Sequence, residues 1–403
     1  MKACGIIVEY NPFHNGHLHH AKEARKISQA KCLIAVMSGS FLQRGEPAII
    51  DKFHRTKAAL NAGIDIVIEL PYPYAVQSST LFAKGSVKTL YNIGVSNICF
   101  GSEQGNINPF IQSFNLYKKH FKTYQTELKH FLAQGYAYPA ASKYAYEKIG
   151  LTTKEIDLSQ PNNILGFSYV KTILENRLPI EPLTIRRANS HYHDRTVKDD
   201  IASATSIRQK LFEQQSITTD IACTIPDVTK QQLIRYKNEA TLWHMWEYYY
   251  PLLHYRVMTM TPKELSLIHG VDEGLEYRIK HTAKKATSFT DWISRLKTKR
   301  YTWTRLQRIC VHILTNTTKE QIKSITENNT IPYIRILGFT KTGRVYLNHI
   351  KKHINIPLIT QFGRHQHLAL MLEERASNTF YSVLPSKQQR KLRKQELHPP
   401  IFV

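Results

Sequence analysis

Two histidines stand near the start of the chain in the run His14-Asn15-Gly16-His17. Their imidazole groups are hydrogen-bond donors that could stabilise the charge that develops on a nucleotide's α-phosphate when it is attacked. Gly16 has no side chain, so a phosphate could approach the backbone closely. Two surface histidines in an ordinary turn would show the same pattern, so the interpretation depends on where the fold places them.

The segments around the histidines predict that place. Residues 3–8 form a short, apolar, β-branched run that is typical of a strand buried on both faces. Proline at position 12 ends this strand, and residues 18–28 predict a helix. A strand, a turn and a helix in this order place free N–H groups and a positive dipole end where anions bind at a sheet edge. The pattern resembles the signature of the HIGH superfamily, which contains nucleotidyltransferases and class I aminoacyl-tRNA synthetases.

A second potential anion site lies at residues 203–208, Ser-Ala-Thr-Ser-Ile-Arg. Ser203 or Thr205 can cap a helix, and Arg208 would lie one turn into it, an arrangement suited to β- and γ-phosphates. A capped helix without a ligand would explain these residues equally well if they stood alone. Nucleotidyltransferases, however, carry both motifs in this order, whereas class I synthetases would show a Lys-Met-Ser-Lys-Ser-type loop that we do not find.

Strand and helix patterns alternate as far as about residue 215. Further strands are predicted at residues 31–37, 64–70, 95–100 and 181–185, and helices at 52–62, 78–93, 108–134 and 163–176. This order predicts an α/β fold with a Rossmann-like parallel sheet, helices on both faces and ligands at the carboxyl ends of the strands. We therefore expect residues 1–215 to form a nucleotidyltransferase-like domain.

Polar segments follow several of these strands. The loop at residues 38–47 is rich in small residues and donors, and Arg44, Lys52 or Arg55 could face an anion there, although a plain surface loop is an equal alternative.

Glycine at position 101 would let a base or ribose lie against the main chain. Arg186 and Arg187 could hold phosphate oxygens. Asn162 and Asn163 begin a predicted helix, where a capping role is a sufficient reason for an asparagine.

Composition points to a polyanionic partner. The chain has 403 residues, with 55 Lys and Arg against 31 Asp and Glu, which gives a net charge of +24. This excess of positive charge favours a nucleic acid over a membrane as the binding partner. A proteome in which most proteins are basic is an alternative explanation of the charge. Five cysteines without paired spacing argue against a zinc ribbon or a disulfide framework, so we expect no protein-bound metal. We find no signal peptide or membrane-spanning run, and a cytoplasmic protein is expected.

Helical patterns dominate from about residue 216, for example at 229–245, 261–268 and 272–286, while residues 334–343 predict a strand and a turn. We expect residues 216–403 to form a mainly helical, basic region that binds RNA. Basic residues alternate with aromatics in one segment of it: Arg295, Lys297, Lys299, Arg300, Tyr301 and Trp303. Such a mixture suits an RNA backbone and unstacked bases, and a solvated basic face is the alternative. We expect residues 386–394 to form a basic tail helix or a disordered arm.

With these pieces assembled, the chain resembles the bacterial tRNA(Met) cytidine acetate ligase family over nearly its whole length. The most specific matching segments are 5–17, 37–47, 100–103, 162–166, 203–208, 274–279 and 335–339. The resemblance implies that ATP activates acetate as acetyl-adenylate, which then acetylates N4 of the wobble cytidine of elongator tRNA(Met). His14 and His17 are the expected catalytic residues, and Mg²⁺ is expected with ATP.

The ATP site that the resemblance implies comprises Ile7, Val8, Glu9, Tyr10, Asn11, Pro12, Phe13, His14, Asn15, Gly16, His17, Leu18, His19, His20, Gly101, Asn162 and Arg187. Ser203, Thr205 and Arg208 are expected to join it. Two alternatives remain open at this point: a nucleotidyltransferase acting on a small phosphorylated metabolite, and a non-catalytic nucleotide-sensing RNA-binding protein. The sequence does not give the oligomeric state.

Overall fold

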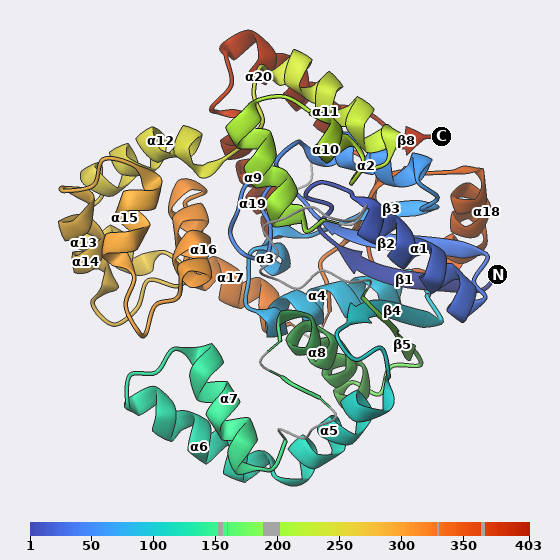
Figure 1. Cartoon of the computed structure of the whole chain (residues 1–403), viewed down its shortest axis with the longest axis horizontal. Helices are drawn as coiled ribbons and strands as arrows, with labels where there is room; N and C mark the ends of the chain where they lie inside the picture. Colours follow the sequence, from blue (N-terminus) through green and yellow to red (C-terminus); the bar gives the residue numbers. More distant parts are fainter. Residues whose placement is uncertain (152–155, 159, 188–201, 329, 364–366) are drawn as a thin grey trace.

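An eight-stranded mixed sheet forms the centre of the molecule in a computed structural model that describes residues 1–151, 156–158, 160–187, 202–328, 330–363 and 367–403 (Figure 1). Its strand order is β5-β4-β1-β2-β3-β6-β7, with β8 paired to β6. The strands are β1 (Ala3–Val8), β2 (Cys32–Ser38), β3 (Ile66–Leu70), β4 (Asn97–Ser102), β5 (Glu181–Arg186), β6 (Ile334–Phe339), β7 (Leu358–Ile359) and β8 (Ile401–Phe402).

The first five strands pair in parallel, as the alternating pattern predicts. Strand β6 then runs antiparallel to β3, so the sheet is mixed and not purely parallel. The register places Val8 opposite Met37 and Ser38 opposite Leu70, which brings the carboxyl ends of β1, β2 and β3 to one edge. That edge is where the loops carrying the predicted anion-binding residues begin.

Alternate strand residues face two separate apolar cores. On one face Cys4, Ile6 and Val8 pack with α1 (Asn15–Ser28) and α2 (Lys52–Asn61). On the other face Ala3, Ile34 and Ile98 belong to the core that contains α4 (Ser79–Asn92), α8 (Pro161–Glu175) and α18 (Lys341–Ile350). The central strands carry apolar residues at nearly every position because both faces of the sheet are covered.

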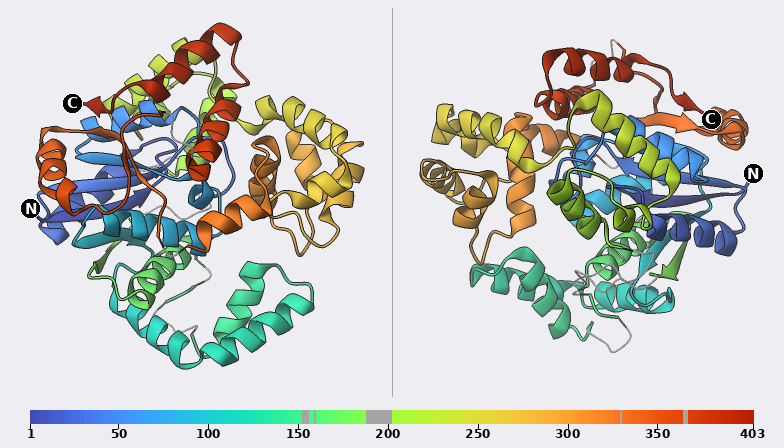
Figure 2. Two further views of the ribbon diagram at one scale, coloured as in Figure 1. Left: turned by 180° about the vertical axis from the view of Figure 1, so that it is seen from behind. Right: turned by 45° about the horizontal axis from the view of Figure 1, so that its top comes forward.

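Two groups of helices project from the same side of the sheet and the helices that cover it (Figures 1 and 2). The first contains α5 (Asn108–Lys119), α6 (Phe121–Ala133) and α7 (Tyr138–Lys148). The second contains α12 (Trp246–Thr259), α13 (Pro262–Leu267), α14 (Leu275–Ala283), α15 (Phe289–Leu296) and α16 (Trp303–Leu314). The remaining helices are α3 (Tyr72–Ala75), α9 (Ala204–Gln214), α10 (Thr219–Ala222), α11 (Asp227–Ala240), α17 (Lys319–Thr326), α19 (Leu368–Tyr381) and α20 (Ser386–Arg393), with short 3-10 helices η1 (Lys351–His353) and η2 (Lys394–Leu397).

Several predicted helix limits were wrong. The single helix predicted at 108–134 is two helices, because His120 leaves the helical region between α5 and α6. The helix predicted at 229–245 ends at Ala240, where Thr241 takes a left-handed conformation with φ 71°. The turn predicted after β6 is the start of α18, whose N-terminus is capped by the Thr340 side chain.

The basic tail begins with a helix, α20, whose Leu392 is buried. The division of the chain at residue 215 stays a prediction, but the sheet takes strands from both sides of it. No helix within the described residues is both long and apolar enough to cross a membrane.

A buried charge cluster joins the late part of the chain to the sheet. Lys52 lies 2.7 Å from Glu69 and 2.9 Å from Glu396, and Arg335 lies 2.7 Å and 2.6 Å from the same two carboxylates. Glu373, from α19, lies 3.6 Å from Lys52 and accepts a hydrogen bond from the backbone of Tyr72. Lys52 therefore faces buried carboxylates, and the expectation that it could face a ligand anion is wrong.

The two central carboxyl groups of this cluster differ in charge. Burial and the neighbouring Glu69 raise the pKa of Glu373 well above its usual value. Burial opposes ionisation of Glu69 as well, but the charges of Lys52 and Arg335 hold its pKa below the usual value. The cluster thus contains two cations, two carboxylates and one neutral carboxyl group, and its charges balance.

This difference predicts unequal effects of two matched substitutions. Glu69→Gln removes a charge that balances two buried cations, and we expect it to lower the free energy of unfolding by about 3–5 kcal/mol. Glu373→Gln replaces a neutral carboxyl group by a neutral amide and should lower the free energy of unfolding far less. Denaturant unfolding at neutral pH measures both values. Equal losses for the two variants would contradict the assigned charges.

Candidate functional site

The two histidines form the N-terminal cap of α1. The Nδ1 atom of His14 accepts a hydrogen bond from the Gly16 backbone N–H at 3.0 Å. The Nδ1 atom of His17 accepts one from the His14 backbone N–H at 3.3 Å. Because each ring uses Nδ1 as an acceptor, each neutral ring carries its proton on Nε2. The cap thus satisfies two free backbone donors of the helix and leaves both Nε2–H groups for a ligand.

Both rings are neutral near pH 7. Burial lowers the pKa of His14 to about 3, and the positive charges of Arg187 and Arg208 act in the same direction. Burial also lowers the pKa of His17 well below its usual value, with further contributions from His14 and Arg187. The histidines therefore offer hydrogen bonds to an anion without titrating, beside the positive end of the α1 dipole.

The turn before the histidines is fixed from several directions. Tyr10 and Phe13 are each 1% exposed, and their rings pack against each other with centroids 4.6 Å apart. The Tyr10 ring also meets the edge of the His17 ring at 5.0 Å. The Asn11 side chain accepts a hydrogen bond from the Ile49 backbone at 2.7 Å. These contacts hold the histidine rings in one orientation.

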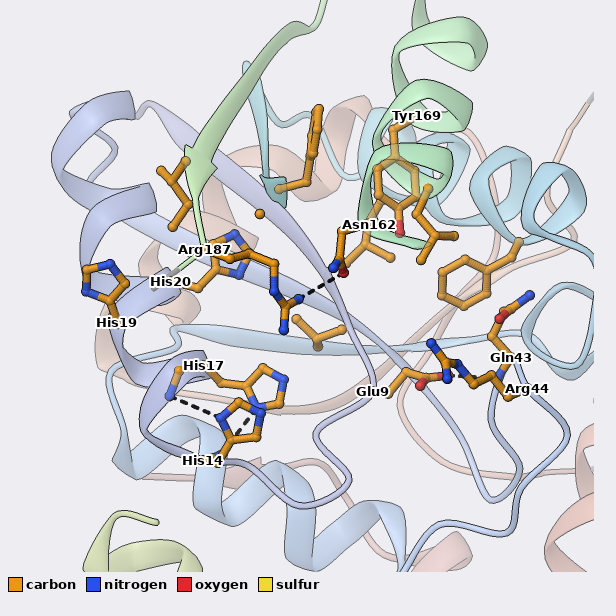
Figure 3. A pocket seen from close by; sticks show the side chains of 18 of the residues that line it. Glu9, His14, His17, His19, His20, Gln43, Arg44, Asn162, Tyr169 and Arg187 are labelled. Atoms are coloured by element: carbon orange, nitrogen blue, oxygen red, sulfur yellow. Dashed lines mark hydrogen bonds between the residues drawn. The ribbon is translucent and has the colours of Figure 1, made fainter. Parts of the chain in front are cut away.

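A cavity of about 240 Å³ opens beside the cap (Figure 3). Figure 3 shows His14 and His17 on one side, Arg187 and Asn162 across from them, and Glu9, Gln43 and Arg44 at the far end. A second cavity of about 360 Å³ adjoins it. The two cavities share Glu9, His14, His17, Arg44, Asn162 and Arg187.

The second cavity brings the two predicted anion motifs together. It is lined by Ser203, Thr205 and Arg208 as well as by both histidines. Ser203 is the N-cap of α9 and accepts a hydrogen bond from the Ser206 backbone at 3.1 Å, which decides between the two predicted capping residues. Thr205 is exposed in the first turn of that helix.

Arg208 positions the loops around this space. It donates to the Asn11 carbonyl at 2.9 Å and forms an ion pair with Glu46 at 2.7 Å. One guanidinium thus joins the turn after β1 to the loop after β2. A phosphate in the second cavity would share this guanidinium with Glu46.

A chain of hydrogen bonds orients Arg187. Its guanidinium donates to the Asn162 side-chain oxygen at 2.9 Å, and the Asn162 amide donates to Glu103 at 2.7 Å. The helix cap predicted at Asn162 or Asn163 is wrong, because α8 begins at Pro161 and Gln160 is its N-cap residue. A Cβ atom on Gly101 would lie 3.1 Å from the Arg187 side chain, so the glycine makes room for it.

Arg55 was also expected to face an anion, and this was wrong. It is 1% exposed, and its guanidinium donates to the carbonyls of Glu9, Ser38, Gly39 and Ile50. It therefore ties the carboxyl ends of β1 and β2 together beneath the site. Glu9 in turn accepts a hydrogen bond from the Gln43 backbone at 2.7 Å, and burial raises the pKa of its carboxyl group.

Most predicted nucleotide-site residues line these two spaces. The first cavity is lined by Ile7, Val8, Glu9, His14, Gly16, His17, His19, His20, Gly101, Asn162 and Arg187, and the second also by Tyr10 and Asn11. Pro12, Phe13, Asn15 and Leu18 line neither cavity. Sequence reasoning missed Gln43, Phe82, Tyr169, Ile185 and Ala202. Phe82 and Tyr169 lie in helical patterns that look like ordinary core. Gln43, which follows a strand, and Ala202, which precedes Ser203 in the second motif, are the missed residues that carried a signal in the sequence.

The predicted RNA-binding segment runs from the last turn of α15 to the first residue of α16. Lys297 and Lys299 are exposed, whereas Arg295 is paired with Asp291 at 2.8 Å and Arg300 with Glu273 at 2.5 Å. Trp303 is half-buried at the start of α16. Tyr301 is 7% exposed, its hydroxyl donates to the Asp272 carbonyl, and Arg305 covers its ring, so it supports the loop and is not a free stacking surface.

Comparisons with known proteins agree with this fold. A family model described as HIGH Nucleotidyl Transferase matches residues 1–396. A tRNA(Met) cytidine acetate ligase from Oceanobacillus iheyensis is 53% identical over 403 residues, which cover 100% of both chains. The Bacillus subtilis protein of the same name is 44% identical over 94% of this chain and 92% of its own.

Solved structures agree as well. The apo form of Thermotoga maritima TmcAL superposes with a TM-score of 0.90 at 32% identity, covering 100% of both chains. The same protein bound with alpha-thio ATP superposes with a TM-score of 0.88 at 32% identity, again covering 100% of both chains.

The geometry of the cap predicts the protonation state of both histidines. Across pH 5 to 8, His14 and His17 should remain neutral with the proton on Nε2, because burial holds both pKa values below this window. Long-range ¹H–¹⁵N NMR spectra of histidine-labelled protein measure the tautomer and the titration. Protonation of either ring near pH 6.5, the value of an unperturbed histidine, would contradict this account of the cap.

Proposed function

Because the chain belongs to the tRNA(Met) cytidine acetate ligase family of HIGH nucleotidyl transferases, we propose that it uses ATP to join acetate to the wobble cytidine of elongator tRNA(Met). The observation that carries this proposal is the pair of neutral imidazole donors at the N-terminus of α1, which face a cavity that also contains Arg187. This arrangement suits the stabilisation of charge on a reacting phosphate.

The first step forms acetyl-adenylate. An acetate oxygen attacks the α-phosphorus of ATP, a new P–O bond forms, and the bond to the bridging oxygen breaks to release pyrophosphate. The Nε2–H groups of His14 and His17 donate to the phosphoryl oxygens as their charge grows. Ser203 and Thr205, which line the second cavity at the start of α9, would hold the leaving pyrophosphate.

Mg²⁺ would accompany ATP as its counter-ion. The described part of the chain contains no group of three or more His, Cys, Asp or Glu side chains that could hold a metal ion. The carboxylates beside the cavities are engaged, since Glu46 pairs with Arg208 and Glu103 accepts from Asn162. The ion would therefore be held mainly by the phosphate oxygens and would neutralise part of their charge.

The second step transfers the acetyl group. The exocyclic amine of cytidine attacks the acetyl carbonyl, a C–N bond forms, and AMP leaves with the electrons of the broken C–O bond while the amine loses a proton. The amine is a weak nucleophile because its lone pair is delocalised into the ring, so the acetyl group must be activated first. The exposed Lys297 and Lys299 would bind the tRNA backbone, and a cytoplasmic location fits a tRNA substrate.

Acetate-dependent exchange of pyrophosphate into ATP, measured without RNA, tests the proposal. His17→Ala should slow this exchange roughly 100-fold, because it removes one donor to the reacting phosphate. His349→Ala, at an exposed position on α18, should exchange at the wild-type rate.

Unchanged exchange in His17→Ala would mean that His17 only caps the helix. A wild-type enzyme that shows no exchange dependent on acetate would overturn the acetate ligase function itself.

A further inference from the structure

A larger cavity, of about 700 Å³, lies next to the first one. Its walls come from α7 and α16, one helix from each projecting group, and from α8, which packs on the sheet. It shares Gln43, Arg44 and Leu165 with the cavity beside the histidines. Figure 3 shows Gln43 and Arg44 at the end of that first cavity away from His19 and His20, so the two spaces meet there.

One wall carries a buried amide with an unused donor. Gln77 is 3% exposed, and its side-chain oxygen accepts a hydrogen bond from His269 Nε2 at 3.2 Å. Its Nε2 atom has no hydrogen-bond partner among the described residues. A buried N–H group without a partner is costly, and Gln77 is one of the residues that line this cavity.

Arg308, from α16, also lines the cavity. Among the described residues its guanidinium makes one hydrogen bond, to the Gln43 carbonyl at 3.5 Å. Burial and the charge of Arg305 lower its pKa to about 10, so it stays charged at neutral pH. Gly45 has φ +79°, and a Cβ atom there would lie 2.3 Å from the Arg308 backbone nitrogen, so the loop after β2 packs directly on α16.

The rest of the cavity suits a flat, partly apolar ring on a charged backbone. Tyr146, Phe167 and Ile309 contribute apolar surface. Lys143 on α7 and Arg305 on α16 add positive charge from opposite sides. This combination of apolar walls and flanking cations is typical of sites that bind an unstacked base and the adjoining phosphates.

We propose that this cavity receives the target cytosine base of the tRNA, with the Gln77 amide and the Arg308 guanidinium donating to ring N3 and to O2. This inference rests on the proposed function. Both cytosine atoms are acceptors, so the unused donors match them, and the exocyclic amine is then free to point toward the cavity that contains acetyl-adenylate. Uracil carries a hydrogen on N3, which would face the Gln77 N–H group, so the same contacts disfavour uridine. The anticodon loop is single-stranded, so presenting the base costs little.

Gln77→Glu tests the contact to N3. The variant keeps an oxygen for His269 but replaces the donor by an acceptor, and acetyl transfer to wobble-cytidine tRNA should fall about 10- to 100-fold in kcat/KM. Inhibition of this transfer by a wobble-uridine tRNA should become stronger relative to wild type, since the carboxylate can accept the uracil N3–H. The rate of acetate-dependent pyrophosphate exchange without RNA should remain within about twofold of the wild-type rate. This measurement tests the proposed acetate activation independently of the cavity for the base.

Two further variants keep the test decisive. Gln214→Glu, exposed on α9, likewise keeps an accepting oxygen for its partner Thr218 and should change neither reaction. Thr304→Trp places a bulky ring on the α16 wall and should block transfer while exchange continues. If Gln77→Glu and Thr304→Trp both transfer acetyl at the wild-type rate, or if Gln77→Glu leaves the discrimination between cytidine and uridine unchanged, the base does not enter this cavity.

Discussion

The site depends on two backbone N–H groups at the start of α1 that donate to imidazole nitrogens. These bonds fix the Nδ1 atoms of His14 and His17 as acceptors and direct both protons to Nε2. A serine or aspartate could cap the helix equally well, but neither would leave a neutral N–H donor facing the cavity. The same two side chains thus stabilise the helix and provide the donors, and a substitution that alters the cap also alters the donors that face the cavity.

The loop after β2 connects this cap to the rest of the molecule. Arg55 joins its first residues to the end of β1, Arg208 binds Glu46, and Gly45 packs on α16. The buried charge cluster then fixes α2 and β3 to β6 and the C-terminal helices. The groups to which we assign acetate activation and those to which we assign RNA binding therefore meet at one loop, which suits a reaction whose intermediate must be passed between them.

The sequence was sufficient for local features and insufficient for long-range ones. The strand at residues 3–8, the histidine turn and a cap at Ser203 or Thr205 follow from apolar periodicity and capping chemistry. The antiparallel insertion of β6, the roles of Lys52 and Arg55, and the lining by Phe82 and Tyr169 depend on partners far along the chain. A lysine that meets three buried carboxyl groups and a lysine on a solvated helix face look the same in sequence, because charge type alone does not specify its partner.

Discharge of a preformed intermediate tests the central claim most directly. Enzyme incubated with ATP, Mg²⁺ and labelled acetate, without RNA, should release pyrophosphate and retain acetyl-adenylate. Addition of tRNA with cytidine at the wobble position should then give AMP and N4-acetylcytidine, as measured by mass spectrometry of the nucleotide and of the tRNA. Wobble-uridine tRNA lacks the amine and should leave the intermediate intact. Appearance of ADP in place of AMP, or of a nucleotide monophosphate covalently attached to an acceptor, would contradict the account.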